Sequence, residues 1–331
     1  MEHTETHIEI LNASLSAKIE RHFDTLDTDP DVLEQLLSDK RSPNTKAAYQ
    51  KDINDFFREM TGNLATPDSV LEFLHLTESQ AVKVVLKYKA RLFQRGLKEA
   101  TVNRRLSAIK SLVAMGKKLG VCAYSLTDII KGEKSEKYRD TTGVSRDDFR
   151  LILQQCDLTT VKGKRDYALL RLLWDNALRR NEIAQANISD FDPDSRALKI
   201  RGKGKGTETQ TIDLAPVTVQ AISSWLTERG HSEPDAPLFI ALDFANHGHR
   251  LTGEAIRYTV DKLTKKAGIT KKMSPHRVRH SSITAALDAT DGNIRKVQKL
   301  SRHADPRTLM IYDDNRHKDQ QEISGLLADM V

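Results

Sequence analysis

The stretch that decides the fold of this chain reads Ser274-Pro275-His276-Arg277-Val278-Arg279-His280 and, further on, His303-Ala304-Asp305-Pro306-Arg307-Thr308-Leu309-Met310-Ile311-Tyr312. The Ser-Pro pair predicts a helix start, which places His276 and Arg279 on one face of the first turns. A helix N-terminus attracts anions, so these side chains predict a phosphate site. The Asp-Pro pair starts another helix that carries Tyr312 about two turns along. Together these residues favour attack by a tyrosine on a DNA phosphodiester.

The composition predicts a cytoplasmic, globular protein with two domains. The chain has 331 residues, of which 38% are hydrophobic and 30% charged. No apolar run reaches the ~18 residues of a membrane helix, and the first residues lack the basic and apolar regions of a signal peptide. The two cysteines, Cys122 and Cys156, lack the spacing of metal ligands, so neither a metal nor a disulfide is expected.

The charge is unevenly distributed along the chain. The net charge is +6, but residues 1–40 hold ten acidic and three basic residues, a net −7, so the remainder carries +13. A basic chain that follows an acidic N-terminal segment favours a polyanionic partner. We expect an acidic N-terminal extension at 1–40, a helical domain at 41–130, a charged linker at 131–143 and a second domain at 144–331.

The 41–130 segment predicts a helical domain with a basic surface. Ser42 and Pro43 predict a helix start, and further helices are expected at about 69–74, 79–95 and 101–118 from their apolar periodicity and closing glycines. Thr101 is the expected cap of the last helix. Basic residues on these helices are expected to contact DNA phosphates: Lys46, Lys83, Lys87, Arg91, Arg104, Arg105 and Lys110.

The 144–331 segment contains further candidates, each with an ordinary structural alternative. Arg179 follows a strongly apolar helix at 165–176, and Glu182 is placed to hold it; a surface ion pair is the alternative. Lys203 lies in a glycine-rich turn between strands at 197–200 and 209–214, and could be a solvated turn residue. His276 and Arg279 fit a capped surface helix equally well, and Tyr312 could simply pack in a core.

The ordered set is more specific than its members. Taken together, the residues resemble the tyrosine recombinase, or phage integrase, family of the two-domain Xer-like type, whose pattern is Arg, hairpin Lys, His-x-x-Arg, His or Trp, then Tyr. The matching residues are Arg179, Lys203, His276, Arg279, His303 and Tyr312. Residues 42–52 and 101–106 resemble the family's core-binding domain. Arg302 and Ala177 depart from the family, which commonly has glycine at both positions. Arg302 is expected to alter the rim of the pocket or to add a phosphate contact.

The resemblance implies a fold and a chemistry. The fold is mainly α, with a helical SAM-like core-binding domain and an α-rich catalytic domain that contains a small antiparallel sheet. Tyr312 would form a covalent 3′-phosphotyrosine, with His276 as base and Lys203 as acid. Arg179, Arg279 and His303 would bind the phosphate. Glu182 and His280 would support this pocket, and no cofactor is implied.

The implied reaction is site-specific recombination of double-stranded DNA, serving integration, excision or resolution. The expected assembly is a homotetramer on two DNA sites in the nucleoid. An accessory recombinase or a DNA-bending protein is a further candidate partner. Two alternatives remain at this point. One is a type IB topoisomerase or hairpin-end resolvase with the same pocket. The other is a DNA-binding architectural protein that has lost catalysis.

Overall fold

The computed structural model describes residues 30–134, 143–202, 208–230, 233–314 and 319–330. The chain divides into two compact units, Met1–Tyr138 and Arg139–Val331. The boundaries expected at residues 41, 131 and 144 remain predictions. Among the described residues, no helix has the length and apolar character needed to cross a membrane.

The first unit is helical. Its helices are α2 (Val32–Ser38), α3 (Pro43–Thr61), α4 (Pro67–Leu74), α5 (Glu78–Gln94) and α6 (Glu99–Lys118). Thr66 and Thr77 each begin a helix with a capping box, and Gly62 ends α3 in the left-handed conformation at φ 84°. The last helix begins at Glu99 with Lys98 before it, so the prediction that Thr101 caps it was wrong.

Aromatic side chains organise the core of this unit. Phe56 lies at the centre, and its ring centroid is 5.1 Å from those of Phe57, Phe73 and Tyr88, all edge to face. Each such ring, when buried, stabilises the fold by about 1.5–3 kcal/mol. α2 contributes three buried side chains to the same core, Val32, Leu33 and Leu36. Residues 32–38 therefore pack with the helical unit, although sequence reasoning placed them in the extension.

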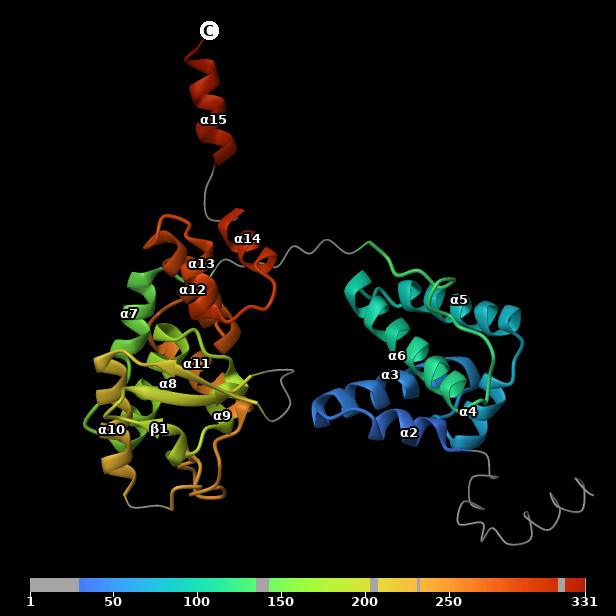
Figure 1. The fold of residues 1–331 in the computed structure, drawn as a ribbon, viewed down its shortest axis with the longest axis horizontal. Helices are drawn as coiled ribbons and strands as arrows, with labels where there is room; N and C mark the ends of the chain where they lie inside the picture. The colour runs from blue at the N-terminus through green and yellow to red at the C-terminus, as the bar shows by residue number, and fades with distance from the viewer. Residues whose placement is uncertain (1–29, 135–142, 203–207, 231–232, 315–318, 331) are drawn as a thin grey trace, which may run out of the picture. The chain divides into compact units, whose positions relative to one another are not determined.

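The second unit surrounds a small sheet with helices (Figure 1). Its helices are α7 (Arg146–Gln154), α8 (Val161–Asp175), α9 (Arg180–Gln185), the 3-10 helix η2 (Ile188–Asp190), α10 (Pro216–Arg229), α11 (Gly253–Lys266), α12 (Pro275–Asp288), α13 (Ile294–Ser301), α14 (Arg307–Asp314) and α15 (Asp319–Ala328). The described strands β1 (Phe191–Asp192), β2 (Ala197–Arg201) and β3 (Thr209–Asp213) form one antiparallel sheet in that order. The expected fold class, mainly α with a small antiparallel sheet, is confirmed.

The second unit has a main core and a smaller one. The apolar run of α8 is buried in the main core, as its sequence predicts, and packs against α10 and α12. The smaller core contains Ala177, Ile283, Leu287, Val297, Leu309 and Tyr312. Figure 1 shows α12, α13 and α14, which supply most of it, gathered at one end of the unit. The tyrosine of α14 is thus fixed next to the first turns of α12.

Candidate active site

Arg179 lies between the end of the buried helix α8 and the first residue of α9. Ala177 has φ 46°, a left-handed conformation that turns the chain sharply after α8. Arg179 then becomes the N-cap residue of α9, and its backbone N–H donates to Glu182 Oε2 at 2.7 Å. Its Nη1 donates to Glu182 Oε1 at 2.8 Å. The Glu182 side chain is only 1% exposed, so it is a buried support for Arg179 and not half of a surface pair.

The N-terminus of α12 forms as its sequence predicts. Ser274 caps it, accepting the Arg277 N–H at 3.3 Å, and Pro275 occupies the first turn. His276 Nε2 lies 2.8 Å from His280 Nε2, one turn further along. A hydrogen bond between two imidazole nitrogens needs one of them to lack a proton, so at least one ring of this pair is neutral.

Arg279 is buried and reaches a different set of partners. Its Nη1 donates to Ala177 O, its Nη2 donates to Ser301 O, and Nη2 lies 3.3 Å from His303 Nε2. Burial, reinforced by the charges of Arg179 and Arg302, lowers the pKa of Arg279 to about 10. The guanidinium therefore remains protonated at neutral pH and contributes positive charge to the pocket.

Tyr312 lies between two imidazoles. Its ring stacks on His280, with centroids 4.8 Å apart and planes 25° apart, and the His303 ring is 6.1 Å away. The Tyr312 side chain is buried, with 3% of the residue exposed. The pairs described here join two groups of residues in one cluster. His276, Arg279 and His280 come from α12, and His303 and Tyr312 follow at least 23 residues later, so only tertiary packing can bring the two groups together.

Arg302 joins the same group of residues through hydrogen bonds that the sequence did not predict. Its backbone has φ 56° at the end of α13, and its side chain is 7% exposed. Its Nη2 donates to Glu182 Oε2 at 3.0 Å and to Ala177 O at 3.3 Å. The only sequence signal was the arginine in place of the family's glycine. The rim position or phosphate contact that this departure suggested does not match its inward orientation.

Lys203 lies outside the described residues, which break off after residue 202 and resume at residue 208. Its role as a general acid remains a prediction. The hairpin itself is present, with Leu198 opposite Ile212 and Arg201 opposite Thr209 in register. Among the described residues no group of three histidine, cysteine or acidic side chains is placed to hold a metal ion.

The basic residues expected to contact DNA have two kinds of surroundings. Lys46, Lys83 and Lys87 are exposed. The arginines instead form ion pairs within the helical unit: Arg91 with Glu59 at 3.2 Å, Arg104 with Asp52, and Arg105 with Asp55. Arg105 is 9% exposed. All seven DNA contacts, Lys110 included, remain predictions, and the buried Arg105 is the least accessible of them.

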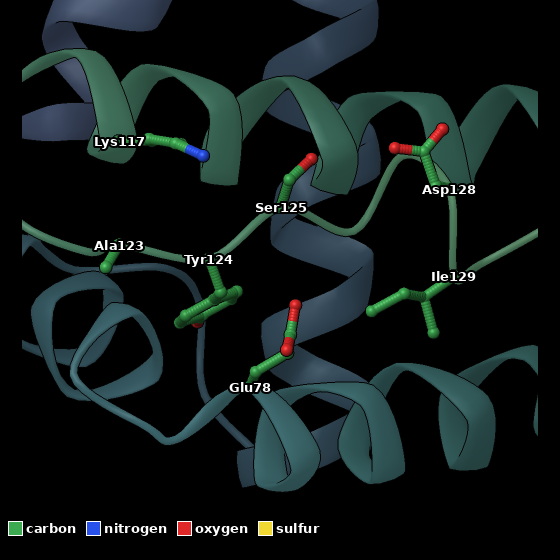
Figure 2. Close-up of a pocket in the computed structure, with 7 residues that line it drawn as sticks. All are labelled: Glu78, Lys117, Ala123, Tyr124, Ser125, Asp128 and Ile129. Carbon is green, nitrogen blue, oxygen red and sulfur yellow. The ribbon is translucent and has the colours of Figure 1, made fainter.

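A shallow pocket in the helical unit is lined by none of the seven expected DNA-contact residues. Figure 2 shows Glu78 and Lys117 facing the segment that holds Tyr124, Asp128 and Ile129. None of the predicted catalytic residues lines it. The candidate active site is therefore the histidine–arginine–tyrosine cluster in the second unit.

Comparison with known proteins agrees with this geometry. The phage integrase family matches residues 144–319, and its N-terminal SAM-like domain matches residues 32–118. A tyrosine recombinase of Synechocystis sp. is 52% identical over 300 residues, covering 91% of this chain and 95% of that protein. One of Synechococcus elongatus is 47% identical over 303 residues, covering 92% and 94%.

A solved structure shares the fold. The XerH site-specific recombinase, bound to a palindromic difH substrate after cleavage, has a TM-score of 0.65 at 20% identity, covering 89% of this chain and 84% of that one. The resemblance inferred from the ordered residues is confirmed. This chain belongs to the phage integrase family and is a tyrosine-type site-specific recombinase, an enzyme that cleaves and rejoins DNA.

Proposed function

We propose that Tyr312 is the nucleophile and that the surrounding cluster activates one phosphodiester of duplex DNA. The observation that carries this is the position of the Tyr312 ring, stacked on His280 and next to the His303 that contacts Arg279. A phenol has a reference pKa of ~10 and must lose its proton as it attacks. Positive charge and proton acceptors within the same cluster suit that requirement.

Each side chain then takes one part of the reaction. The Tyr312 oxygen forms a bond to phosphorus while the bond to the 5′-oxygen breaks, which leaves a 3′-phosphotyrosine and a free 5′-hydroxyl. His276, paired with His280, accepts the phenolic proton, and Lys203 supplies the proton of the leaving oxygen. The reverse attack by a 5′-hydroxyl rejoins the strand, because the phosphotyrosine conserves the bond.

The two arginines stabilise the phosphate as its charge redistributes. Arg179 is held by Glu182, but its side chain remains 30% exposed. Its guanidinium can therefore donate hydrogen bonds to a bound phosphate. Arg279 contributes its charge from the interior, and His303, whose Nε2 lies 3.3 Å from Arg279 Nη2, would hydrogen-bond the same phosphate. Guanidinium groups thereby supply the charge that metal ions supply in other phosphoryl-transfer enzymes.

We further propose that the active assembly is a tetramer on two duplex sites. Recombination exchanges two strands at each of two sites, which needs four nucleophiles. Exposed apolar side chains in α15 support subunit contacts, since Leu326 and Leu327 are 60% and 59% exposed. Deleting residues 321–331 should abolish cooperative DNA binding, and unchanged cooperativity would argue against this contact. Both units would contact the same duplex, and an accessory recombinase or DNA-bending protein could assist.

The nucleophile is tested with a nicked suicide duplex. The duplex sequence comes from genomic fragments that the Tyr312→Phe variant enriches, since this variant should bind without cleaving. A nick a few nucleotides beyond the scissile phosphate lets the 5′-hydroxyl fragment diffuse away, which traps the covalent complex. Wild type should form the adduct and Tyr312→Phe should not. The matched control is Tyr258→Phe, which alters a tyrosine 61% exposed on α11. Adduct from Tyr312→Phe would overturn the proposal.

A further inference from the structure

The Arg302 side chain points into the protein and has no terminal donor left for a substrate. Its Nη1 donates to Asn176 O at 3.0 Å and to Leu300 O at 2.8 Å. Its Nη2 donates to Ala177 O at 3.3 Å and to Glu182 Oε2 at 3.0 Å. Two terminal nitrogens carry four hydrogens, and all four face protein acceptors. The fifth donor, Nε–H, has no partner among the described residues but is buried, so Arg302 presents no exposed donor to a phosphate.

The backbone of Arg302 is in a conformation that disfavours side chains. Its φ of 56° and ψ of 36° are left-handed, where a Cβ crowds the following carbonyl and glycine is preferred. Ala177, whose carbonyl it contacts, is also left-handed at φ 46°. Two such residues joined by a hydrogen bond indicate that the side-chain contacts of Arg302 offset the backbone strain.

Glu182 connects Arg302 to the pocket. One carboxylate oxygen, Oε1, accepts from Arg179 Nη1, and the other, Oε2, accepts from Arg302 and from the Arg179 backbone N–H. Without Arg302, only the Arg179 backbone N–H would hold Oε2, and the carboxylate could turn toward the Arg179 guanidinium to form a two-pronged pair. That pair would occupy the donors that a phosphate needs.

We propose that Arg302 is a positioning residue that acts through Glu182 to keep the Arg179 guanidinium available to the scissile phosphate. It has a second link to the pocket, because Ala177 O accepts from both Arg302 and Arg279. This inference rests on the proposed function of Arg179. It assigns a role to a residue whose terminal nitrogens donate to protein acceptors.

The test is single-turnover cleavage of the nicked duplex by Arg302→Met and Arg302→Lys. Arg302→Met keeps the length and the left-handed backbone but removes the charge. The matched control is Arg196→Met, because Arg196 is also left-handed, at φ 53°, but exposed. We expect Arg302→Met to lower the maximal rate by about tenfold or more. The DNA concentration at half-maximal rate should change by less than about threefold.

Arg302→Lys should recover part of the rate, because its ammonium can pair with Glu182 but cannot also fill the carbonyl sites. A substrate with a methylphosphonate at the scissile position separates loss of charge stabilisation from loss of packing, because a packing defect would slow the cleavage of both substrates equally. The methylphosphonate removes the negative charge that Arg179 neutralises, so the penalty of Arg302→Met should shrink on this substrate. An equal penalty on both substrates would contradict the proposal.

The Glu182→Gln background decides the question if Arg302→Met does not fold. In the Glu182→Gln protein, adding Arg302→Lys should lower the cleavage rate little further. If Arg302→Lys lowers the rate by the same factor in Glu182→Gln as in wild type, the role of Glu182 is overturned. If folded Arg302→Met cleaves at the wild-type rate while wild type and Arg196→Met form the adduct normally, the role of Arg302 is refuted. The proposed function of Tyr312 is then unaffected. No adduct from wild type would instead contradict the proposed function.

Discussion

Glu182→Gln should destabilise the catalytic unit far more than an isosteric change normally does. The glutamate is the only acidic group shown pairing with Arg179 and Arg302 among the described residues. Glutamine has the same shape but no charge, and its NH2 group must replace one of two oxygens that each accept from a guanidinium. One arginine would then face a donor in place of an acceptor.

The magnitude follows from the burial of the two pairs. Removing one partner of a buried ion pair costs about 3–5 kcal/mol. Two features reduce this here: Arg179 is 30% exposed, and Arg302 keeps three backbone carbonyls as acceptors. We therefore expect a loss of about 2–3 kcal/mol in the free energy of unfolding.

The assay is urea unfolding followed by tryptophan fluorescence. The chain has two tryptophans, Trp174 and Trp225, and both lie in the catalytic unit, so their emission reports that unit alone. With a slope of about 2 kcal/mol per molar urea, the midpoint should fall by about 1–1.5 M.

The matched control is Glu254→Gln, which removes a carboxylate that is 66% exposed and paired with Arg257 and Arg180. An exposed pair of this kind contributes little to stability, because water screens both charges. Equal midpoints for Glu182→Gln and Glu254→Gln would refute the idea that Glu182 is a buried junction of two arginines.

Three further predictions concern other parts of the chain. Burial raises the pKa of Cys156 to about 12, so at pH 8 about one thiol in ten thousand is ionised, and alkylation followed by mass spectrometry should label it only after unfolding. Burial alone would raise the pKa of the Asp55 carboxyl. Hydrogen bonds and nearby positive charges, of which the hydrogen bond with Arg95 is the largest, lower this pKa below 3.8. Its stabilisation should therefore be lost as pH falls through that depressed value, and Asp55→Asn should flatten acid unfolding followed by circular dichroism. In Gly143→Ala the new Cβ would lie 1.8 Å from Ser281 Oγ, so thermal unfolding should show a loss of about 1–3 kcal/mol that Ser281→Ala partly reverses.

Local sequence rules predicted the parts of the site that are close in sequence. The Ser-Pro start of α12 and the four-residue step from His276 to His280 follow from helix geometry alone. The support of Arg179 by Glu182 also follows from three-residue spacing. The contact of Arg279 with His303 needs the packing of α12 against α13, which only the family resemblance could suggest.

The remaining features depend on tertiary structure that no local pattern encodes. Arg302 occupies a left-handed position that sequence rules assign to glycine, and a buried arginine there requires acceptors from three separate segments. The burial of Arg105 was missed because charge patterns do not distinguish a free cation from one paired with a distant carboxylate. β1 has two residues, too few for a periodic signal.

The most direct test of the account is to identify the amino acid that carries the DNA. The adduct trapped from wild type on the nicked duplex is digested with trypsin and nuclease, and the nucleotide-bearing peptide is sequenced by mass spectrometry. Cleavage after Arg307 and Arg316 places Tyr312 alone among tyrosines in its peptide. We predict a 3′-linked nucleotide on Tyr312 in that peptide. A nucleotide on any other residue, Tyr258 included, would contradict it.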